Sequence, residues 1–388
     1  MAGRILLITD GAASAYYGLE LLRELRRHGY TVKVAPTGYS GTSALSFVSE
    51  LSWAAYSGHP ALNLSELDVK AVKWAELVLL APVSEAVLSV FGRGGALKLL
   101  QEAGVPVAAI PARIPGNPIS PTPEWLSALP GGGSILEPEA GETMQLGALG
   151  EIAIAPVATV VEYIARCFTR QVLKGKRLFL TAGPTIEDID PVRFITNRSS
   201  GKMGLAIALA AVAAGAEVTM IHGPLNIALP RIPGLKYVPV RSAADMHRAS
   251  SEYWSSSHIA VLAAAVADFT PDHYAESKIK KKSGQGLALN LVRTNDILAE
   301  IGSLGQKPFL VGFAAESDDV EINALVKLRK KHCDMLCAND IREPGAGFAV
   351  DTNRITIYDC DGNAIPLPML SKREAAKRII NEIAKRVK

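Results

Sequence analysis

The chain has 388 residues, of which 48% are hydrophobic and 20% are charged, so it can bury the cores of two or three domains. Its formal net charge is +3, from 41 Lys and Arg against 38 Asp and Glu. This near balance excludes a strong overall attraction to nucleic acid or to a membrane surface, and any basic site must therefore be local.

The cysteines and the apolar segments indicate the cellular compartment. Cys167, Cys333, Cys337 and Cys360 lack the paired spacing of a structural zinc site, and free, mostly buried thiols suit a reducing cytosol. The chain enters an apolar segment directly after Arg4, without a signal peptide. Its longest apolar runs are far shorter than the roughly 18 residues of a membrane helix. We predict a cytoplasmic protein with no membrane partner and no nucleic-acid partner.

Strands alternate with helices along the first half of the chain. A strand-like run over 4–11 ends in a glycine turn, and an amphipathic helix over 19–28 is followed by a strand over 31–35. Two further strands are predicted over 77–82 and 105–110. This order of strand, turn, helix and strand predicts a parallel sheet with helices on both faces.

A segment rich in Pro and Gly closes this half. Residues 111–142 include a run of three glycines, and we predict loops there with one short helix around Trp125. A helix predicted over 157–173 then leads to the boundary that we predict between domains of residues 1–173 and 174–388.

The second half repeats the same order of elements. A strand over 177–183 precedes a helix over 204–214 and a strand over 217–221. Later strands are predicted over 259–264, 309–313, 335–338 and 354–358. The predicted fold class is α/β, with two tandem Rossmann-like modules whose sheets are mostly parallel.

A loop with the parts of an anion site follows the first strand of the second half. The segment DPVRFITNRSSGKMG from Asp190 runs directly into the apolar helix predicted from Gly204. Its candidate ligand-binding side chains are Arg193, Asn197, Ser199, Ser200 and Lys202. Because backbone N–H groups at a helix N-terminus attract anions, we predict a phosphate-bearing ligand here.

The other strand ends of the second half carry small residues and acids. Ligands of parallel sheets gather at such carboxyl ends, and the residues found there are Gly183, Ala265, Asp268, Phe313 and Glu316. Asp268 and Glu316 are candidates to take ribose hydroxyls or a magnesium-bound phosphate. For one strand, packing of helices explains the small residues better, but four strands that end in this way favour a nucleotide site.

Two groups of lysines supply local positive charge. Lys278 and Lys280 belong to the segment KIKKKSGQG, which we interpret as a flap over phosphates. Lys327 and Lys331 are four residues apart on one face of a predicted helix, and we expect them to contact a nucleoside triphosphate. The alternatives are a solvated lysine cluster for the first pair and compensation of the helix dipole for the second.

In this order, these segments resemble the ligase half of the bifunctional phosphopantothenoylcysteine decarboxylase and phosphopantothenate–cysteine ligase family. The resemblance covers roughly residues 175–388. The matching blocks are AGPT at Ala182, DPVRFITNRSSGKMG at Asp190, AAVADFTP at Ala264, KIKK at Lys278, VGFAAE at Val311, KLRKK at Lys327 and AND at Ala338.

The resemblance implies a two-step ligation in coenzyme A biosynthesis. The carboxylate of 4'-phosphopantothenate attacks the α-phosphate of CTP, with Mg2+, and the amine of cysteine then displaces CMP from the acyl-cytidylate. By motif position, Asn197 would hold the acyl carbonyl, and Lys278 would act in the step that consumes the intermediate. The remaining implied contacts are Gly183, Ala265, Asp268, Lys280, Phe313, Lys327 and Lys331 for the nucleotide, and Arg193, Ser199, Ser200 and Lys202 for the substrate. The metal ligands and the choice between CTP and ATP stay open.

The first half resembles the flavin-dependent decarboxylase of the same family in its frame, which implies a flavodoxin-like domain. SGHP at Ser57 and KWAELVLLAP at Lys73 carry this likeness. The active positions differ, however. Asp68 stands where the family has its catalytic histidine, and Ser84-Glu-Ala-Val replaces the TANT motif.

Two further motifs of the decarboxylase are missing. The asparagine block expected after Pro111 is absent, and residues 144–150 contain no cysteine. Without a base, a cysteine and a flavin site, no group in this half is evident that would lower the barrier to decarboxylation. FMN binding and decarboxylase activity are therefore not expected. The main alternative is a fully bifunctional enzyme in which Asp68 or His59 serves as the base, although the SGHP segment predicts an exposed loop for His59.

Two other classes of protein explain less of the sequence. A nicotinamide dehydrogenase would need a G-x-G-x-x-G turn after a first strand, which neither half has. A regulatory or scaffold protein would explain the first half but not the ligand-facing residues of the second. Because ligase halves of the resembled family form dimers and its flavin halves form trimers, the resemblance implies a homo-oligomer with dimeric ligase domains and small-molecule substrates as partners.

Overall fold

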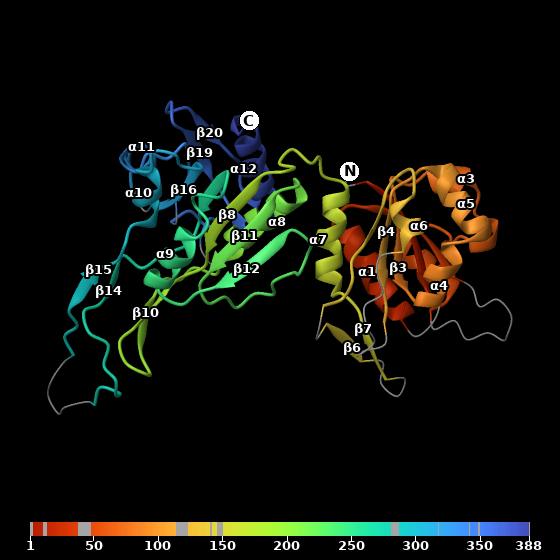
Figure 1. Cartoon of the computed structure of the whole chain (residues 1–388), viewed down its shortest axis with the longest axis horizontal. Helices are drawn as coiled ribbons and strands as arrows, with labels where there is room; N and C mark the ends of the chain where they lie inside the picture. The colour runs from red at the N-terminus through yellow and green to blue at the C-terminus, as the bar shows by residue number, and fades with distance from the viewer. Residues whose placement is uncertain are drawn as a thin grey trace. The chain divides into compact units, whose positions relative to one another are not determined.

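The structure, a computed structural model, describes residues 3–10, 14–37, 48–113, 123–139, 142–145, 150–280, 287–316, 318–340, 342–347 and 350–387. The chain divides into two compact units, Met1–Thr169 with Pro230–Pro233 and Arg170–Leu229 with Gly234–Lys388 (Figure 1). The predicted boundary after residue 173 lies close to this division. In the described parts of the chain, no helix is both long and apolar enough to span a bilayer.

The sheet of the first unit is parallel throughout, with the strand order β2–β1–β3–β4–β5. Its strands are β1 (Arg4–Asp10), β2 (Thr31–Thr37), β3 (Leu77–Val83), β4 (Val107–Pro111) and β5 (Gly133–Ile135). This 2-1-3-4-5 order is that of flavodoxin-like folds. The fold predicted for the first half is therefore confirmed.

The helices of the first unit bury one face each against this sheet or against one another. They are α1 (Ala15–Arg27), α2 (Glu50–Ser57), α3 (Val69–Lys73), α4 (Glu85–Phe91), α5 (Gly94–Ala103), α6 (Glu124–Ser127) and α7 (Val157–Cys167). In α1, the leucines Leu21, Leu22 and Leu25 are fully buried at helical spacing. A two-stranded ribbon, β6 (Thr143–Gln145) with β7 (Glu151–Ala153), completes the unit.

One strand of this sheet lies in the segment that the sequence predicts to be loops around a single short helix. The helix is α6, but β5 pairs with β4. A Cβ atom on Gly133 would lie 1.9 Å from the carbonyl oxygen of Leu126, so the glycine permits a close approach of the strand to α6. The loop prediction is wrong for Gly133–Ile135 because the glycine serves packing and not a turn. The helix predicted over 157–173 is also shorter and ends at Cys167.

The sheet of the second unit has eight strands in the order β12–β11–β8–β13–β16–β17–β19–β20. They are β8 (Arg177–Ala182), β11 (Glu217–His222), β12 (Leu235–Pro239), β13 (Ile259–Leu262), β16 (Phe309–Glu316), β17 (Met335–Asp340), β19 (Thr356–Asp359) and β20 (Ala364–Pro366). The first six are parallel in the Rossmann order 3-2-1-4-5-6, and the last two are antiparallel. The order reverses between β8 and β13, where such folds bind ligands.

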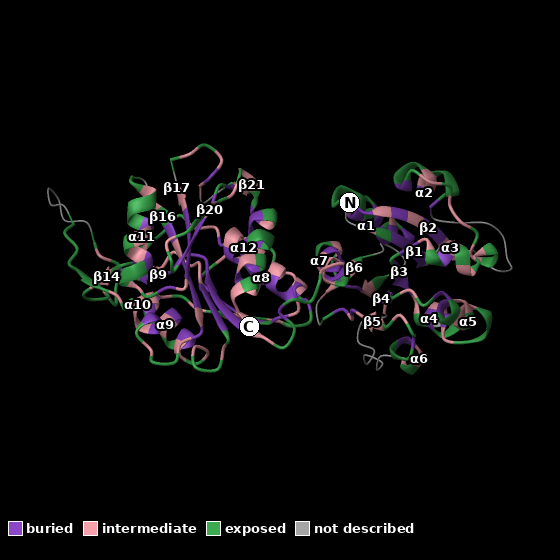
Figure 2. Cartoon of the chain, turned by 90° about the horizontal axis from the view of Figure 1, so that it is seen from above, coloured by how far each residue is buried: buried purple, intermediate pink, exposed green. Residues whose placement is uncertain are grey.

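Helices cover both faces of this second sheet, and Figure 2 shows the buried strands between them. The helices are α8 (Lys202–Ala213), α9 (Ala243–Ser251), α10 (Ile297–Gly302), α11 (Val320–Lys330) and α12 (Lys372–Arg386). Two short ribbons project from the loops: β9 (Ile186–Asp188) with β10 (Phe194–Thr196), and β14 (Phe269–Pro271) with β15 (Leu291–Arg293). A third ribbon, β18 (Thr352–Asn353) with β21 (Leu370–Ser371), packs beside α12. The predicted α/β class is therefore confirmed for both units.

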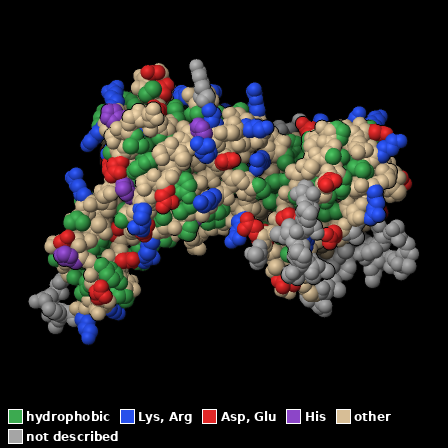
Figure 3. Space-filling model, viewed as in Figure 1, with side chains coloured by type: hydrophobic (Ala, Val, Ile, Leu, Met, Phe, Trp, Pro, Cys, Tyr) green, Lys and Arg blue, Asp and Glu red, His purple; other side chains and the backbone are tan. Residues whose placement is uncertain are grey.

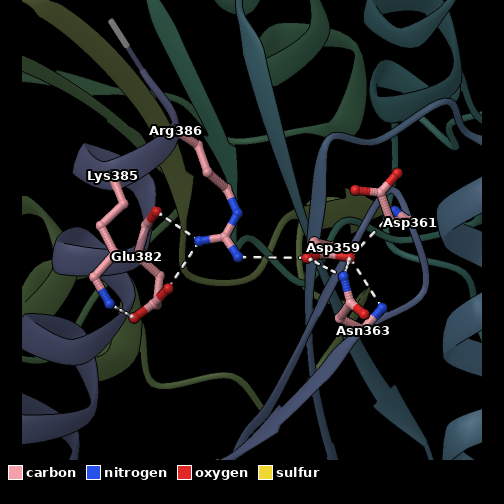
Figure 4. Close-up of polar contacts among 6 residues, drawn as sticks. All are labelled: Asp359, Asp361, Asn363, Glu382, Lys385 and Arg386. Carbon is pink, nitrogen blue, oxygen red and sulfur yellow. Dashed lines mark hydrogen bonds and ion pairs between the residues drawn. The ribbon is translucent and has the colours of Figure 1, made fainter.

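The last helix, α12, packs on α8 and is tied to the sheet at its C-terminal end (Figure 4). Arg386 donates to Glu382 at 2.8 Å and to Asp359 of β19 at 3.4 Å. Asp359 also accepts the backbone N–H groups of Asp361 and Asn363, at 3.1 and 2.9 Å. One carboxylate therefore closes the β19–β20 turn and holds α12 against it.

The cysteines differ in exposure. Cys333 and Cys337 are buried, whereas Cys167 and Cys360 are exposed, and all four are free thiols. The prediction of mostly buried thiols therefore holds for two of the four. Burial raises the pKa of the Cys333 thiol to about 12, so this residue is an inert core side chain.

Candidate functional site

A cavity of about 710 Å³ opens in the second unit at the carboxyl ends of β8, β13 and β16. This is the edge where the strand order reverses. Of the residues predicted from the sequence, the cavity is lined by Ser199, Ser200, Lys202, Ala265, Asp268, Phe313, Lys327 and Lys331. Figure 3 shows Lys and Arg spread over the visible surface among Asp and Glu, in keeping with the small net charge of the chain.

Glycines bring the start of α8 close to β8. Gly201 caps the helix in the left-handed region, at φ 73°, and no side chain caps the first turn. A Cβ atom on Gly204 would lie 2.4 Å from the Cβ of Ala182, so only glycine lets the helix pack this closely on the strand. With respect to the described residues, the first turn of α8 therefore offers unpaired N–H groups to an anion in the cavity.

Two lysines stand beside this helix end. Lys202 forms an ion pair with Asp351, with Nζ and Oδ1 2.6 Å apart. Lys372, at the start of α12, is 6% exposed and donates from Nζ to the carbonyls of Gly347 and Val350. Burial, with the charge of Lys202 adding to it, lowers the pKa of Lys372.

Asn353 adds an unpaired polar group to the same end of the cavity. Its side chain is 6% exposed, and its Oδ1 has no hydrogen-bond partner within the described chain. Such a group is costly unless a ligand or water satisfies it. The sequence prediction missed Asn353 and Lys372, and neither residue belongs to the motif blocks that carry the family resemblance.

Asn197 joins the loop before α8 to the end of β13. Its Nδ2 donates to the carbonyls of Ala265, at 2.9 Å, and Val266, at 3.3 Å. An isolated bridge between Pro184 and Ala265 holds the ends of β8 and β13 together, beside Gly183. The structure thus brings Asn197, Ala265 and Gly183 into one corner, with the amide donors of Asn197 engaged by the backbone.

The opposite end of the cavity holds two paired lysines. Lys327 donates from Nζ to the carbonyl of Phe313 at 2.9 Å, and Lys331 forms an ion pair with Asp296. Burial acts to raise the pKa of Asp296, but hydrogen bonds from Lys331 and the Ala299 N–H outweigh it, and the pKa lies below its ordinary value. Residues Arg293 to Asp296 also line the cavity and were missed by the sequence prediction, although only six residues separate RTND from the lysine-rich segment.

Five predicted site residues lie outside the lining of the cavity: Gly183, Arg193, Asn197, Lys278 and Lys280. Arg193 donates to Asp190, and its guanidinium also donates to the carbonyl of Ile279 at 3.3 Å. Lys278 and Lys280 flank Ile279 and are exposed. The rest of the predicted flap, residues 281–286, lies outside the described residues.

Carboxylates in the cavity are the candidate ligands of the expected Mg2+ ion. Asp268 is exposed and lines the cavity, whereas Glu316 does not line it. Among the described residues, no cluster of three or more His, Cys, Asp or Glu could hold a metal ion. Mg2+ commonly binds through one or two carboxylates and substrate phosphates, so Asp268 fits such an ion if the ligand brings the other oxygens.

The first unit uses its replaced motif positions for structure. Asp68 caps α3, with Oδ1 accepting the N–H of Ala71 at 2.7 Å. Ser84 caps α4, and Glu85 of the same helix lies 3.5 Å from the guanidinium of Arg113. Arg113 is itself paired with Glu137 at 2.6 Å. A carboxylate and a neutralised arginine do not fit the phosphate of FMN.

His59 differs from its predicted environment. It is half-buried, and its ring lies 6.5 Å from the ring of Trp74, so it is not a fully exposed loop residue. The glycine turn at residues 11–13, residues 114–122 and part of 144–150 lie outside the described residues.

The family models match both halves of the chain. The model of the DNA/pantothenate metabolism flavoprotein C-terminal domain matches residues 173–387, and the flavoprotein model matches residues 2–101. The chain is 38% identical to the coenzyme A biosynthesis bifunctional protein CoaBC of Bacillus subtilis strain 168, over 98% of this chain and 96% of that protein. The chain belongs to the CoaBC family. The resemblance predicted from the motif blocks is thereby confirmed.

Further relatives extend the comparison. The CoaBC protein of Escherichia coli strain K12 is 36% identical over 100% of this chain and 98% of its own length. A cysteine/cysteine sulfinic acid decarboxylase from an unknown prokaryotic organism is 42% identical over 80% of this chain and 89% of its own. The crystal structure of the C-terminal domain of a CoaBC protein aligns with a TM-score of 0.48 and 41% identity, over 56% of this chain and 97% of its own.

Proposed function

We propose that the second unit joins 4'-phosphopantothenate to cysteine through an acyl-nucleotide intermediate. The observation that carries this proposal is the cavity at the reversal point of the sheet. One end offers the unpaired N–H groups of α8 with Lys202 and Lys372, and the other offers Lys327 and Lys331, while Asp268 also lines the cavity. A cavity of this kind suits a nucleoside triphosphate whose phosphates lie at α8.

The residues of the cavity account for the first step. The substrate carboxylate forms a bond to the α-phosphorus of the nucleotide. The bond from this phosphorus to the bridging oxygen breaks, and pyrophosphate leaves with that oxygen. The α8 N–H groups, Ser199, Ser200 and Lys202 hold the phosphates in line with the carboxylate and offset the charge of the leaving pyrophosphate. Mg2+, bound through Asp268 and phosphate oxygens, would neutralise phosphate charge.

Asn197 and Lys278 are assigned to the second step. The cysteine amine forms a bond to the acyl carbon, and the bond from this carbon to the bridging oxygen breaks. The nucleoside monophosphate leaves with that oxygen and the electron pair, and the amine gives up a proton to solvent water. In our proposal the Asn197 amide turns from the carbonyls of Ala265 and Val266 to the acyl carbonyl, because its neutral N–H groups match the charge that develops there. The ammonium of Lys278 offsets the charge on the departing nucleotide.

CTP is the nucleotide that we propose, with ATP as the alternative. Lys327 and Lys331 lie at the end of the cavity beside Phe313, together with Asp296, which pairs with Lys331. We also propose that the ligase units form dimers and that the protein is cytoplasmic. Exposed apolar side chains on the projecting ribbons support the dimer; they are Val192, Phe194, Phe269, Tyr274 and Leu291.

For the first unit, we propose that decarboxylase activity is lost and that the domain is structural. Asp68, which caps a helix, stands at the motif position of the catalytic histidine. Glu85, an acid, stands within the segment that replaces the TANT motif. The alternative is a fully bifunctional enzyme, in which Asp68 or the half-buried His59 would have to serve as the base.

Two substitutions test the ligase assignment. Asn197→Ala and Lys278→Gln should each abolish formation of phosphopantothenoylcysteine, measured by mass spectrometry with CTP and Mg2+ present. Lys377→Gln is a matched control, because this lysine is half-exposed on α12 and pairs only with the neighbouring Glu374 among the described residues. Full activity in both of the first variants would sink the assignment.

A further inference from the structure

Asp190 is a buried carboxylate that none of the proposed chemical steps uses. Its side chain is 0% exposed. Oδ1 accepts the backbone N–H groups of Val192 and Arg193, each at 2.8 Å, and so closes the turn between β9 and β10. Oδ2 accepts the N–H of Ile279 and the guanidinium of Arg193, each at 3.1 Å. These four donors use the full acceptor capacity of a carboxylate.

The same ion pair holds both backbone polar groups of Ile279. Asp190 accepts its N–H, and Arg193 donates from two nitrogens to its carbonyl at 3.3 Å. A further hydrogen bond, from the N–H of Ala275 to the carbonyl of Ile189 at 3.0 Å, ties the same two segments together. Figure 1 shows these segments extending from the same side of the second unit, at β10 and β14.

The anchored residue lies between two lysines. Lys278 and Lys280 are exposed, while Ile279 is half-buried. A lysine on an exposed segment loses much conformational entropy when it is held against a ligand. Fixing the backbone of the adjacent residue removes part of that cost in advance, because consecutive Cα atoms are about 3.8 Å apart.

We propose that Asp190 is a positioning residue that, through Arg193 and the backbone of Ile279, places Lys278 for the cysteine-dependent step. This inference rests on the proposed ligase function. It gives Arg193 a second task beside the substrate contact predicted from the sequence, because its guanidinium donates to Asp190 and Ile279 within the protein. The buried, charge-assisted geometry suits an anchor and leaves no acceptor on Asp190 for a ligand.

The test compares Asp190→Asn with Asp188→Asn. The first variant can keep the turn through its amide oxygen, but its NH2 group cannot accept the Ile279 N–H. Asp188 lies two residues away and pairs with Arg241 at 2.6 and 2.8 Å, without a hydrogen bond to the lysine segment among the described residues. Both variants therefore lose a carboxylate paired with an arginine, and only one of them loses the anchor.

Two readouts separate positioning from a merely structural role. Pyrophosphate release without cysteine reports the first step, and amide formation on addition of cysteine reports the second. We expect Asp190→Asn to slow the second step roughly 10- to 100-fold while the first changes less than about twofold, since a small misplacement of a catalytic group costs this much. Asp188→Asn should leave both steps unchanged.

Hydrogen exchange checks the anchor without relying on activity. The amide of Ile279 should exchange faster in Asp190→Asn than in the wild type and the control. If Asp190→Asn fails to fold, Ile279→Pro removes the same N–H donor and should slow the second step in the same way. A wild type that makes no amide overturns the proposed function, whereas an active wild type with both steps slowed equally by Asp190→Asn, or with the second step unchanged, overturns only the positioning role.

Discussion

Single side chains determine the charge at one end of the cavity. Lys202, Lys372 and the first turn of α8 make one end of the cavity positive in a chain of net charge +3. Asp351 offsets part of this charge through its pair with Lys202. Local clustering, and not overall composition, therefore makes this end of the cavity positive.

The ionisation of Asp190 makes the free energy of unfolding depend on pH. Burial acts to raise its pKa, but the N–H groups of Val192, Ile279 and Arg193, with the charge of Arg193, outweigh burial and lower the pKa below its ordinary value. The unfolded aspartate has a pKa of about 3.9, so its contribution is complete above this pH and is lost as the pH falls through the lower folded value.

We therefore expect the difference in unfolding free energy between wild type and Asp190→Asn to be largest near neutral pH. It should shrink as the pH falls below about 4, where the unfolded wild type binds a proton and the variant does not. Urea unfolding at a series of pH values measures this difference. A difference that grows on acidification would contradict the lowered pKa.

At the scale of elements, the docking of α12 supports the cavity. This helix begins with Lys372 in the cavity, packs on α8 and ends with Arg386 at the β19–β20 turn. The carboxylate of Asp359 holds that turn through three donors besides Arg386, namely Asp361 N, Asn363 N and Asn363 Nδ2. Asp359, and not the arginine, is therefore the centre of this contact (Figure 4).

Asp359→Ala should lower the unfolding free energy of the second unit by about 1–3 kcal/mol, because it leaves half-buried donors without an acceptor. Arg386→Met should cost less than about 1 kcal/mol, because the turn keeps its own hydrogen bonds. Chemical denaturation of both variants gives the comparison. A larger loss for the arginine variant would show that the ion pair, and not the turn, holds α12.

Sequence patterns predicted the strands and the loop before α8 well, because buried parallel strands are continuous apolar runs bounded by glycines. They failed at Gly133, where a glycine serves close packing, and at His59, whose burial depends on Trp74 from another segment. Lys372 and Asn353 could not be found from spacing, since only the folding of α12 and β18 onto the sheet edge brings them to the cavity. The roles of Asn197 and Lys278 stay predictions.

At the scale of the whole molecule, the two units have diverged differently. The first keeps the flavodoxin-like strand order, while its replaced positions act as helix caps or ion pairs. The second keeps a cavity lined by most of the residues that its family motifs predict. We expect purified protein to be colourless and to release no carbon dioxide from phosphopantothenoylcysteine. A bound flavin with carbon dioxide release would establish the bifunctional alternative.

The ligase reaction itself is the most direct test of the central claim. The full-length protein is incubated with 4'-phosphopantothenate, cysteine, Mg2+ and either CTP or ATP, and the products are followed by mass spectrometry. The account predicts phosphopantothenoylcysteine together with equal amounts of pyrophosphate and nucleoside monophosphate, and more product with CTP. Failure to form the amide with either nucleotide would contradict it.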